Sequence, residues 1–282
     1  MAERVLDKAK LRRSIRAWLL LLPLIIVVLF PYAVMLFTSV TPRAEVFSFP
    51  PRWLPSEIRW QNFVEMWEAA NFGRVLLNSV VVALGSTLLT LAVAIPAAYA
   101  TSRYRFRGQG VYRQFLLITQ MLSPIVLIVG IFRLMVVLGL VDNLFSLVLA
   151  YAAFNLAFSV WMLHSYFRTI PPDVEEAAWI DGASRVQSLA LIFIPMAVPA
   201  MAVVALFAFI FAWNDFVLAL TLLRSSENFT LTLAVYSLVG GRYTVEWHQV
   251  MAATLLATAP IAVMFVVLQR YFMQGLSMGS IK

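Results

Sequence analysis

The chain has 282 residues, of which 62% are hydrophobic and only 12% are charged, and its mean hydropathy is +0.87. A soluble domain carries about 25% charged residues, so this composition excludes an ordinary water-soluble protein and indicates one embedded in a lipid bilayer. The net charge of +7 does not indicate a nucleic-acid-binding protein, because the basic residues are dispersed between apolar runs. The chain has no cysteine and only two distant histidines, so we expect no metal site.

Six apolar segments are long enough to cross a hydrocarbon core as helices, which takes about 20 residues each. In chain order they are Ala17–Val40, Val75–Ala100, Gln114–Leu138, Asn143–His164, Leu191–Leu220 and Gln249–Phe272. The sequence therefore predicts an all-α integral membrane protein with a tail at 1–16, a six-span domain at 17–272 and a second tail at 273–282. The first segment is too long for a cleaved signal peptide and is expected to be retained.

The distribution of basic residues predicts the orientation of the chain. If the N-terminus is cytoplasmic, most of the 21 Lys and Arg residues fall on the cytoplasmic side. An excess of Lys and Arg on one side is the signal that sets the topology of a membrane protein. We therefore expect both tails to be cytoplasmic.

The polar loop between the fourth and fifth segments, residues 165–190, is predicted to form a short helix at the cytoplasmic surface. A proline pair suits the first turn of a helix, and the acidic residues after it would lie near the positive end of the helix dipole. Two alanines keep the surface thin, and Gly182 permits a sharp turn. The residues concerned are, in order, Pro171, Pro172, Asp173, Glu175, Glu176, Ala177 and Ala178.

This loop resembles the cytoplasmic signature of the membrane subunits of bacterial ABC importers. The signature is Glu-Ala-Ala, three residues, Gly, nine residues and then Ile-x-Leu-Pro. The chain has Glu176-Ala177-Ala178, then Gly182, then Ile192-Phe193-Ile194-Pro195. The run Asp181-Gly182-Ala183 and the tail Gly275–Lys282 are similar to the carbohydrate branch of the family, which includes MalG-like subunits.

The resemblance implies a type I ABC importer permease fold with six transmembrane helices and a cytoplasmic coupling helix, in the bacterial plasma membrane. The partners that it implies are a homologous second permease subunit, in a heterodimer, two ATPase subunits and an extracytoplasmic solute-binding protein. The residues assigned to ATPase coupling are Glu175, Glu176, Ala177, Ala178, Asp181, Gly182, Ala183 and Pro195. The alternative for this segment is an ordinary capped helix with solvated acids.

The chain itself is not expected to be an enzyme or to hydrolyse ATP. A phosphate-binding loop needs a glycine-rich stretch followed by Lys and Ser or Thr, and the three lysines Lys8, Lys10 and Lys282 stand in no such setting. We therefore expect no cofactor on this chain, with ATP and Mg²⁺ on the partner ATPase. A membrane-embedded enzyme is disfavoured, because the loop acids have no nucleophile or metal ligand beside them.

Four residues in the spans are candidates for the solute pathway. The amides of Asn155 and Asn214 could bond to sugar hydroxyls, and the rings of Trp161 and Trp213 could stack on a sugar. The alternatives are hydrogen bonds between helices for the amides and interfacial anchoring for the tryptophans. The solute itself stays open between a disaccharide, a monosaccharide or polyol, and a glycerol phosphodiester or phosphate.

Arg133 and Asp215 are ionisable residues within or at the edge of apolar spans, where charges usually face the protein interior. Counted along straight helices, each lies about 30 Å from the cytoplasmic boundary. The hypothesis is an ion pair at an outer gate, and the alternative is that each side chain reaches external water separately.

An ion-driven secondary carrier is the main rival to the importer subunit. Such carriers contain internal repeats and helices broken near mid-membrane. Pro124 could break the third segment, but no repeat relates the two halves of the sequence.

Overall fold

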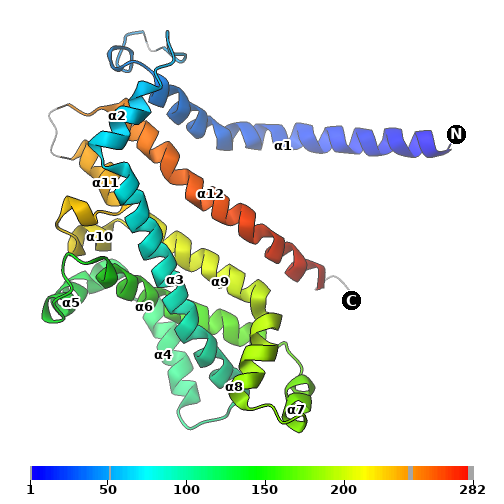
Figure 1. Ribbon diagram of the computed structural model, residues 1–282. Coiled ribbons are helices and arrows are strands. Elements are labelled where there is room, and N and C mark those ends of the chain that lie inside the picture. Colours follow the sequence, from blue (N-terminus) through cyan, green and yellow to red (C-terminus); the bar gives the residue numbers. More distant parts are fainter. Residues whose placement is uncertain (1, 51, 241–243, 279–282) are drawn as a thin grey trace. The chain divides into compact units, whose positions relative to one another are not determined.

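The computed structural model describes residues 2–50, 52–240 and 244–278, and across these ranges it is helical, without a β-strand (Figure 1). The long helices are α1 (Ala2–Val40), α3 (Phe72–Arg103), α6 (Leu144–Phe167), α9 (Ile194–Asn214) and α12 (Trp247–Met278). The shorter α-helices are α2 (Gln61–Ala69), α4 (Gln109–Met121), α5 (Pro124–Val137), α7 (Pro172–Ile180), α8 (Arg185–Ser188), α10 (Val217–Leu222) and α11 (Leu231–Val239). Two 3₁₀ turns, Arg43–Glu45 and Ser226–Asn228, and a π-helical turn, Leu189–Phe193, complete the set.

The described residues divide into two compact units. Unit 1 contains the chain up to Ala70 together with Leu238–Thr258, and unit 2 contains Asn71–Ser237 and the chain from Ala259 onward. In unit 1, the buried Asn62 side chain donates hydrogen bonds to the carbonyls of Ser39 and Thr41, 2.9 and 3.0 Å away. These bonds satisfy carbonyl groups that the end of α1 leaves without a helical partner.

Among the residues that the structure describes, five helices are long and apolar enough to cross a membrane, and a sixth span exists if α4 and α5 are counted together. The five are Ala17–Val40, Phe72–Arg103, Leu144–Phe167, Arg185–Asn214 and Trp247–Gln269. The all-helical membrane fold predicted from the sequence is therefore confirmed.

The predicted third span, Gln114–Leu138, is not one straight helix. The axes of α4 and α5 are bent by 102° at the break between Met121 and Pro124. Proline has no N–H to continue the helix, and it forces the residue before it out of the helical conformation. Ser123 has the extended backbone that this constraint demands, with φ −68° and ψ 133°.

The predicted fifth span, Leu191–Leu220, also ends early. Asp215 leaves the helical conformation with φ −68° and ψ 134°, so α9 stops at Asn214. The Asp215 carboxylate then accepts a hydrogen bond from the backbone N–H of Leu218 at 3.0 Å, at the start of α10. A side-chain acceptor of this kind is typical of a helix N-terminus.

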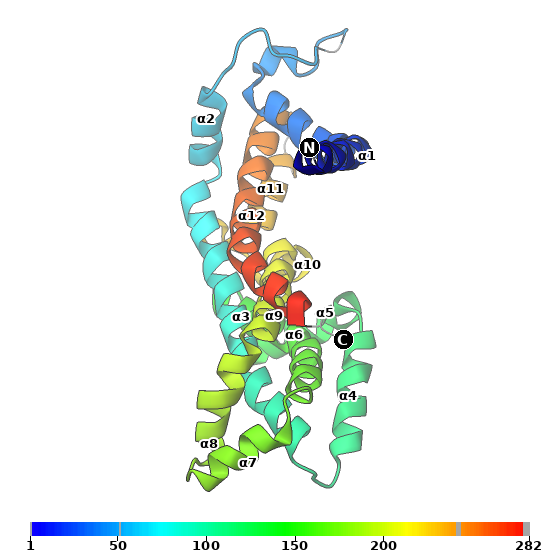
Figure 2. The same ribbon diagram turned by 90° about the vertical axis from the view of Figure 1, so that its right-hand side faces the viewer.

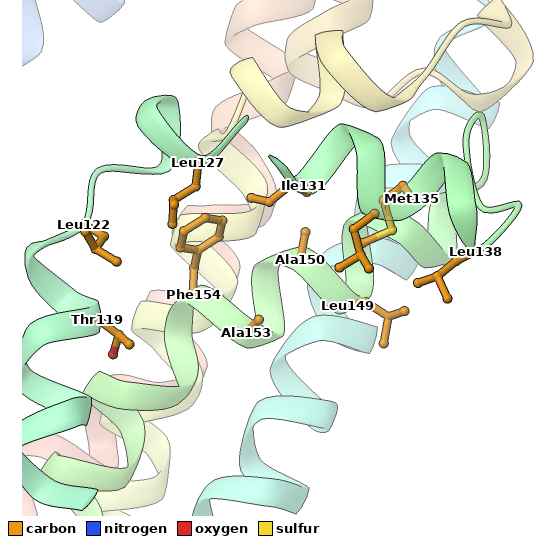
Figure 3. Close-up of a pocket in the computed structure, with 11 residues that line it drawn as sticks. Thr119, Leu122, Leu127, Ile131, Met135, Leu138, Leu149, Ala150, Ala153 and Phe154 are labelled. Carbon is orange, nitrogen blue, oxygen red and sulfur yellow. The ribbon is translucent and has the colours of Figure 1, made fainter. Parts of the chain in front are cut away.

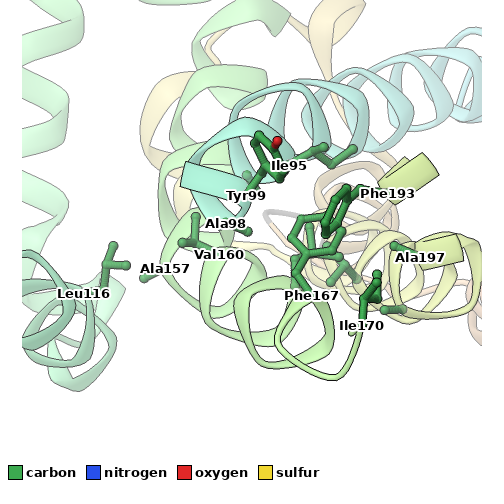
Figure 4. Packing of buried hydrophobic residues seen from close by; sticks show 14 residues of the cluster. Ile95, Ala98, Tyr99, Leu116, Ala157, Val160, Phe167, Ile170, Phe193 and Ala197 are labelled. Atoms are coloured by element: carbon green, nitrogen blue, oxygen red, sulfur yellow. The ribbon is translucent and has the colours of Figure 1, made fainter. Parts of the chain in front are cut away.

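The core of unit 2 is formed by α3, α6 and α9, which contact one another. Small side chains let these helices approach closely, and buried aromatic rings fill the space between them (Figure 4). The Phe193 ring lies 5.0 Å from the Tyr99 ring and 5.5 Å from the Phe167 ring, centroid to centroid. Tyr99 and Phe167 lie in the last turns of α3 and α6, and Phe193 lies directly before α9, so this aromatic cluster lies at the end of the unit that carries α7 and α8. Figure 2 shows α7 and α8 at one end of unit 2.

Candidate functional site

The helix α7 is defined by its own capping residues. Pro171 occupies the N-cap and Pro172 the first helical turn, where its missing N–H costs little. At the other end Gly182 has φ +87°, its N–H donates to the carbonyl of Trp179 at 3.1 Å, and the N–H of Ala183 donates to Ala178 at 2.9 Å. This pair of bonds is a Schellman motif, which needs a residue in the left-handed conformation. The predicted short helix and its glycine turn are confirmed.

A second capped helix follows at once. The Ser184 hydroxyl accepts from the N–H of Gln187 at 3.3 Å, and the Gln187 side chain accepts from the N–H of Ser184 at 2.8 Å. This reciprocal capping box starts α8. Both turns are therefore determined locally, and they fix the direction of the chain between α7 and α9.

Glu175 attaches α7 to the rest of unit 2. Its side chain is buried, its Oε1 accepts a hydrogen bond from the Tyr99 hydroxyl at 2.5 Å, and its Oε2 lies 3.4 Å from Nε of Arg103. The Nη2 atom of Arg103 also donates to the carbonyls of Phe167 and Ile170, at 3.1 and 2.7 Å. The guanidinium lies 4.6 Å above the Phe193 ring. We call Tyr99, Arg103 and Glu175 the clamp, because they join α7 to α3, α6 and the start of α9.

Glu175 is assigned to ATPase coupling from the sequence, with a solvated acid as the alternative, and in the structure its side chain is buried in the clamp instead of solvated. Glu175 points into its own chain, because the end of α3 offers it a hydroxyl and a guanidinium on one face, four residues apart. Its neighbour Glu176 is exposed, as predicted.

The outer face of α7 is formed by small, apolar and acidic residues. Ile180 is 87% exposed, and Trp179 is exposed beside it. The other exposed residues here are Glu176, Ala177, Asp181 and Gly182, whereas Ala178 and Ala183 are half-buried. Pro195 is exposed but lies in the first turn of α9, after the π turn. Exposed apolar side chains rimmed by polar ones are typical of a protein-interaction surface.

The four predicted solute residues are not brought together. Trp161 lies in the last turns of α6, close to the α7 end, whereas Trp213 and Asn214 lie at the opposite end of α9. The Asn155 amide is buried and donates to the carbonyl of Tyr151 at 2.8 Å, and Asn214 donates to Ile210 at 3.0 Å. Both amides bond within their own helices, so the structure does not assemble a sugar site from these residues.

Asp215 does not pair with Arg133, as the outer-gate hypothesis required. The carboxylate accepts from the Tyr151 hydroxyl at 2.9 Å, whereas Arg133 is exposed on α5 and forms no ion pair with any described acidic residue. The hypothesis measured the depth of Arg133 along one straight helix, and the bend at Pro124 makes that measurement invalid.

An apolar cavity of about 400 Å³ lies between α4, α5 and α6 (Figure 3). Of the described residues that line it, Thr119 alone has a polar side chain, and the others include Ile131, Met135 and Phe154. Orienting a polar ligand takes a few placed polar groups in an apolar pocket, so one hydroxyl offers little selectivity for a sugar.

At the end of unit 2 opposite α7, Asp142 holds the loop after α10. Its Oδ1 accepts from the N–H groups of Arg224 and Ser225 at 2.9 and 3.0 Å, and the Ser225 hydroxyl donates to its Oδ2. The hydrogen bonds from Ser225 and Arg224 hold the pKa of Asp142 well below its usual value. Asn78 fixes the same loop from α3, donating to Glu227 and Phe229.

Comparison with known proteins places the chain in a family. Residues 90–278 match the family described as "Binding-protein-dependent transport system inner membrane component". The chain is 34% identical to the "Inner membrane ABC transporter permease protein YcjP" of Escherichia coli (strain K12), over 92% of each chain. It is 33% identical to the "Trehalose/maltose transport system permease protein MalG" of Thermococcus litoralis, over 91% of this chain and 92% of that protein.

A solved structure agrees with the sequence comparison. It is a chain of a bacterial ABC transporter involved in the import of the acidic polysaccharide alginate, with a TM-score of 0.81 and 26% identity, covering 94% of this chain and 98% of that one. The expected importer permease fold is confirmed. The chain belongs to the family of inner membrane components of binding-protein-dependent transport systems.

Proposed function

We propose that this chain is a permease subunit of an ATP-driven importer for a sugar or sugar-like solute. It forms half of the translocation pore, and a second, homologous subunit supplies the other half. Membership of the family supports the importer assignment. The carbohydrate class is supported by one relative named for trehalose and maltose and by one structural neighbour named for alginate.

In this proposal α7 is the coupling helix, and the observation that carries it is the division of α7 into two faces. The outer face, with Glu176, Ala177 and Ile180, is exposed and docks in a separate ATPase subunit. The inner face is held by the clamp, through which movement of α7 reaches α3, α6 and α9. Glu175 is therefore a positioning residue rather than a contact to the ATPase.

The clamp gives a mechanism for alternating access. Two ATPase subunits bind ATP and Mg²⁺, close on the nucleotide and hold α7 in a different position from that in the open state. Only contacts that differ between two states can shift the equilibrium between them. The end of the spans that carries α7 is cytoplasmic in this arrangement, both termini lie on that side, and an external binding protein delivers the solute to the opposite end.

A charge reversal on the outer face tests the docking role. Glu176→Arg is expected to leave the protein inserted but to weaken ATPase binding by about tenfold, the equivalent of about 1.4 kcal/mol. The control is Glu57→Arg, an equal charge change at an exposed residue of unit 1. The ATPase that co-purifies with each variant and the ATP-driven uptake in proteoliposomes are measured. Wild-type values for Glu176→Arg would refute the docking role.

An ion-driven carrier is the second candidate function, and the observation in its favour is the helix broken at Pro124. Uptake by proteoliposomes that contain the chain and an ion gradient, but no ATPase subunit, would support this candidate. Uptake that requires the ATPase subunit and ATP supports the importer.

A further inference from the structure

A polar cavity of about 350 Å³ opens at the end of α3, on the same side of unit 2 as α7. Four arginines line it: Arg103 and Arg105 at the end of α3 and just after it, Arg113 on α4, and Arg168 at the end of α6. A second cavity of about 400 Å³ shares Arg113, His164 and Arg168 and adds Trp161. We call the two cavities together the basic pocket.

The basic pocket carries uncompensated positive charge. Arg103 is paired with Glu175 in the clamp. Arg105, Arg113 and Arg168 form no ion pair with any acidic residue in the described part of the chain, and no acidic residue lines either cavity. Three unpaired guanidinium groups around one space repel one another, and a bound anion removes this repulsion. The planar guanidinium matches the geometry of carboxylate and phosphate oxygens.

The wall of the pocket is fixed by buried hydrogen bonds. Nδ1 of the buried His164 lies 3.2 Å from the hydroxyl oxygen of Thr101, and the side chain of Gln109 donates to the Thr101 carbonyl at 2.5 Å. These contacts join the end of α3 to the start of α4 and to α6. The arginines are therefore presented from three segments that are held together before any ligand binds, as pre-organised binding requires.

The position of the pocket relative to the membrane indicates which class of anion it binds. Its walls are the last turns of the spans Phe72–Arg103 and Leu144–Phe167, where a membrane helix leaves the hydrocarbon core. Trp161 is 50% exposed at this level, and tryptophan is enriched at the membrane–water interface. Basic pockets between transmembrane helices at the cytoplasmic surface bind the phosphate groups of anionic lipids.

We propose that the basic pocket binds the phosphate group of an anionic phospholipid, with Arg113 and Arg168, which face both cavities, as its principal contacts. Free phosphate esters share this chemistry, but they bring no acyl chains to the exposed ring of Trp161. The site is separate from the exposed face of α7.

The test compares two lipids on the purified full-length chain in detergent by native mass spectrometry. Phosphatidylglycerol is expected to bind about tenfold more tightly than phosphatidylcholine with the same acyl chains. The double variant Arg113→Gln/Arg168→Gln is expected to lose this preference. The control Arg107→Gln/Arg133→Gln removes the same charge at two exposed arginines outside the pocket and is expected to keep it.

If the two double variants prefer phosphatidylglycerol over phosphatidylcholine to the same extent, the proposal is overturned. General attraction between the basic protein and an acidic lipid would then explain the binding. Displacement of phosphatidylglycerol by glycerol 3-phosphate or inorganic phosphate at similar concentration overturns the lipid assignment in favour of a soluble phosphate. Circular dichroism checks the helical content. If the pocket double variant loses helix, the single variants Arg113→Gln and Arg168→Gln replace it, each with an expected loss of about threefold, and wild-type preference in both overturns the proposal.

Discussion

Replacing Glu175 by alanine is expected to release α7 from the end of α3 while the spans stay folded. The lost contacts are the hydrogen bond from Tyr99 at 2.5 Å and the ion pair with Arg103 at 3.4 Å. A hydrogen bond to a charged group contributes about 1.5–3 kcal/mol, and removing one partner of a buried ion pair costs about 3–5 kcal/mol. Arg103 keeps two carbonyl acceptors and its side chain is 11% exposed, so the lower value, about 3 kcal/mol, is expected.

Hydrogen exchange of the α7 amides measures this change directly. At about 1.4 kcal/mol for each factor of ten, a loss of about 3 kcal/mol raises the opening equilibrium of α7 by about 150-fold. The matched control is Glu176→Ala in the same helix, where an exposed side chain contributes about 0.5 kcal/mol or less. Glu175→Gln keeps an acceptor for the Tyr99 hydroxyl, so the exchange of its α7 amides is expected to be faster than in Glu176→Ala and slower than in Glu175→Ala.

Equal exchange in Glu175→Ala and Glu176→Ala would show that the clamp does not hold α7. A second readout separates positioning from contact with the ATPase. Glu175→Ala is expected to keep the ATPase bound while ATP-driven uptake falls, whereas Glu176→Arg is expected to weaken ATPase binding itself. Loss of the ATPase in both variants would assign Glu175 to the docking surface.

Three further changes test other parts of unit 2. Gly182→Ala is expected to lower stability by about 1 kcal/mol and to reduce coupled uptake, because a φ of +87° strains any side chain although the space around Gly182 is open. The control is Gly110→Ala, which has the same open space in a helical conformation. Thermal unfolding of the control is expected to show no loss of stability. The pKa of Asp142 is lowered in the folded protein, so its contribution to stability is present above the ordinary pKa of 3.8 and is lost as the pH falls below that value toward the folded pKa. Urea unfolding is measured at about pH 6 and pH 3, and Asp142→Asn is expected to lose less unfolding free energy between the two than the wild type. An equal loss in both proteins would contradict this. Tyr151→Phe removes the hydroxyl that donates to the Asp215 carboxylate, and this is expected to lower the melting temperature, with a loss of stability of about 1–3 kcal/mol. The control Tyr236→Phe changes an exposed tyrosine and is expected to leave the melting temperature unchanged. Equal shifts in melting temperature would refute the role of the Tyr151 hydrogen bond.

Hydropathy and capping chemistry made much of the fold predictable. The predicted span Ala17–Val40 lies within α1 (Ala2–Val40) and ends at the same residue, because long apolar runs have a strong signal. The α7 helix was predictable from its own residues, since the proline pair and Gly182 act locally. The bend at Pro124 had a visible cause, but its angle depends on how α4 and α5 pack against α6.

The clamp could not be predicted, because its members are far apart in sequence. Tyr99 and Glu175 are separated by 76 positions, and nothing in a nine-residue helix distinguishes an acid that points inward from one that points outward. The sequence feature that could have indicated the clamp is the spacing of Tyr99 and Arg103, which lie one turn apart on α3. Pairing it with Glu175 needed the three-dimensional arrangement. The hydrogen bonding of the solute candidates was hidden for a related reason, since the identity of Asn155 does not reveal that its amide bonds to its own helix.

The π turn at Leu189–Phe193 has a consequence for the length of the chain between the coupling helix and α9. In this turn the N–H of Ile194 reaches back five residues to the carbonyl of Leu189, so it holds one residue more than an α-helical turn would. The π turn already absorbs this one extra residue, so a further insertion that the helix does not absorb would rotate every later side chain by about 100° and would carry the ring of Phe193 out of the aromatic cluster. The nine positions between Gly182 and Ile192 are thus expected to tolerate substitutions far better than insertions.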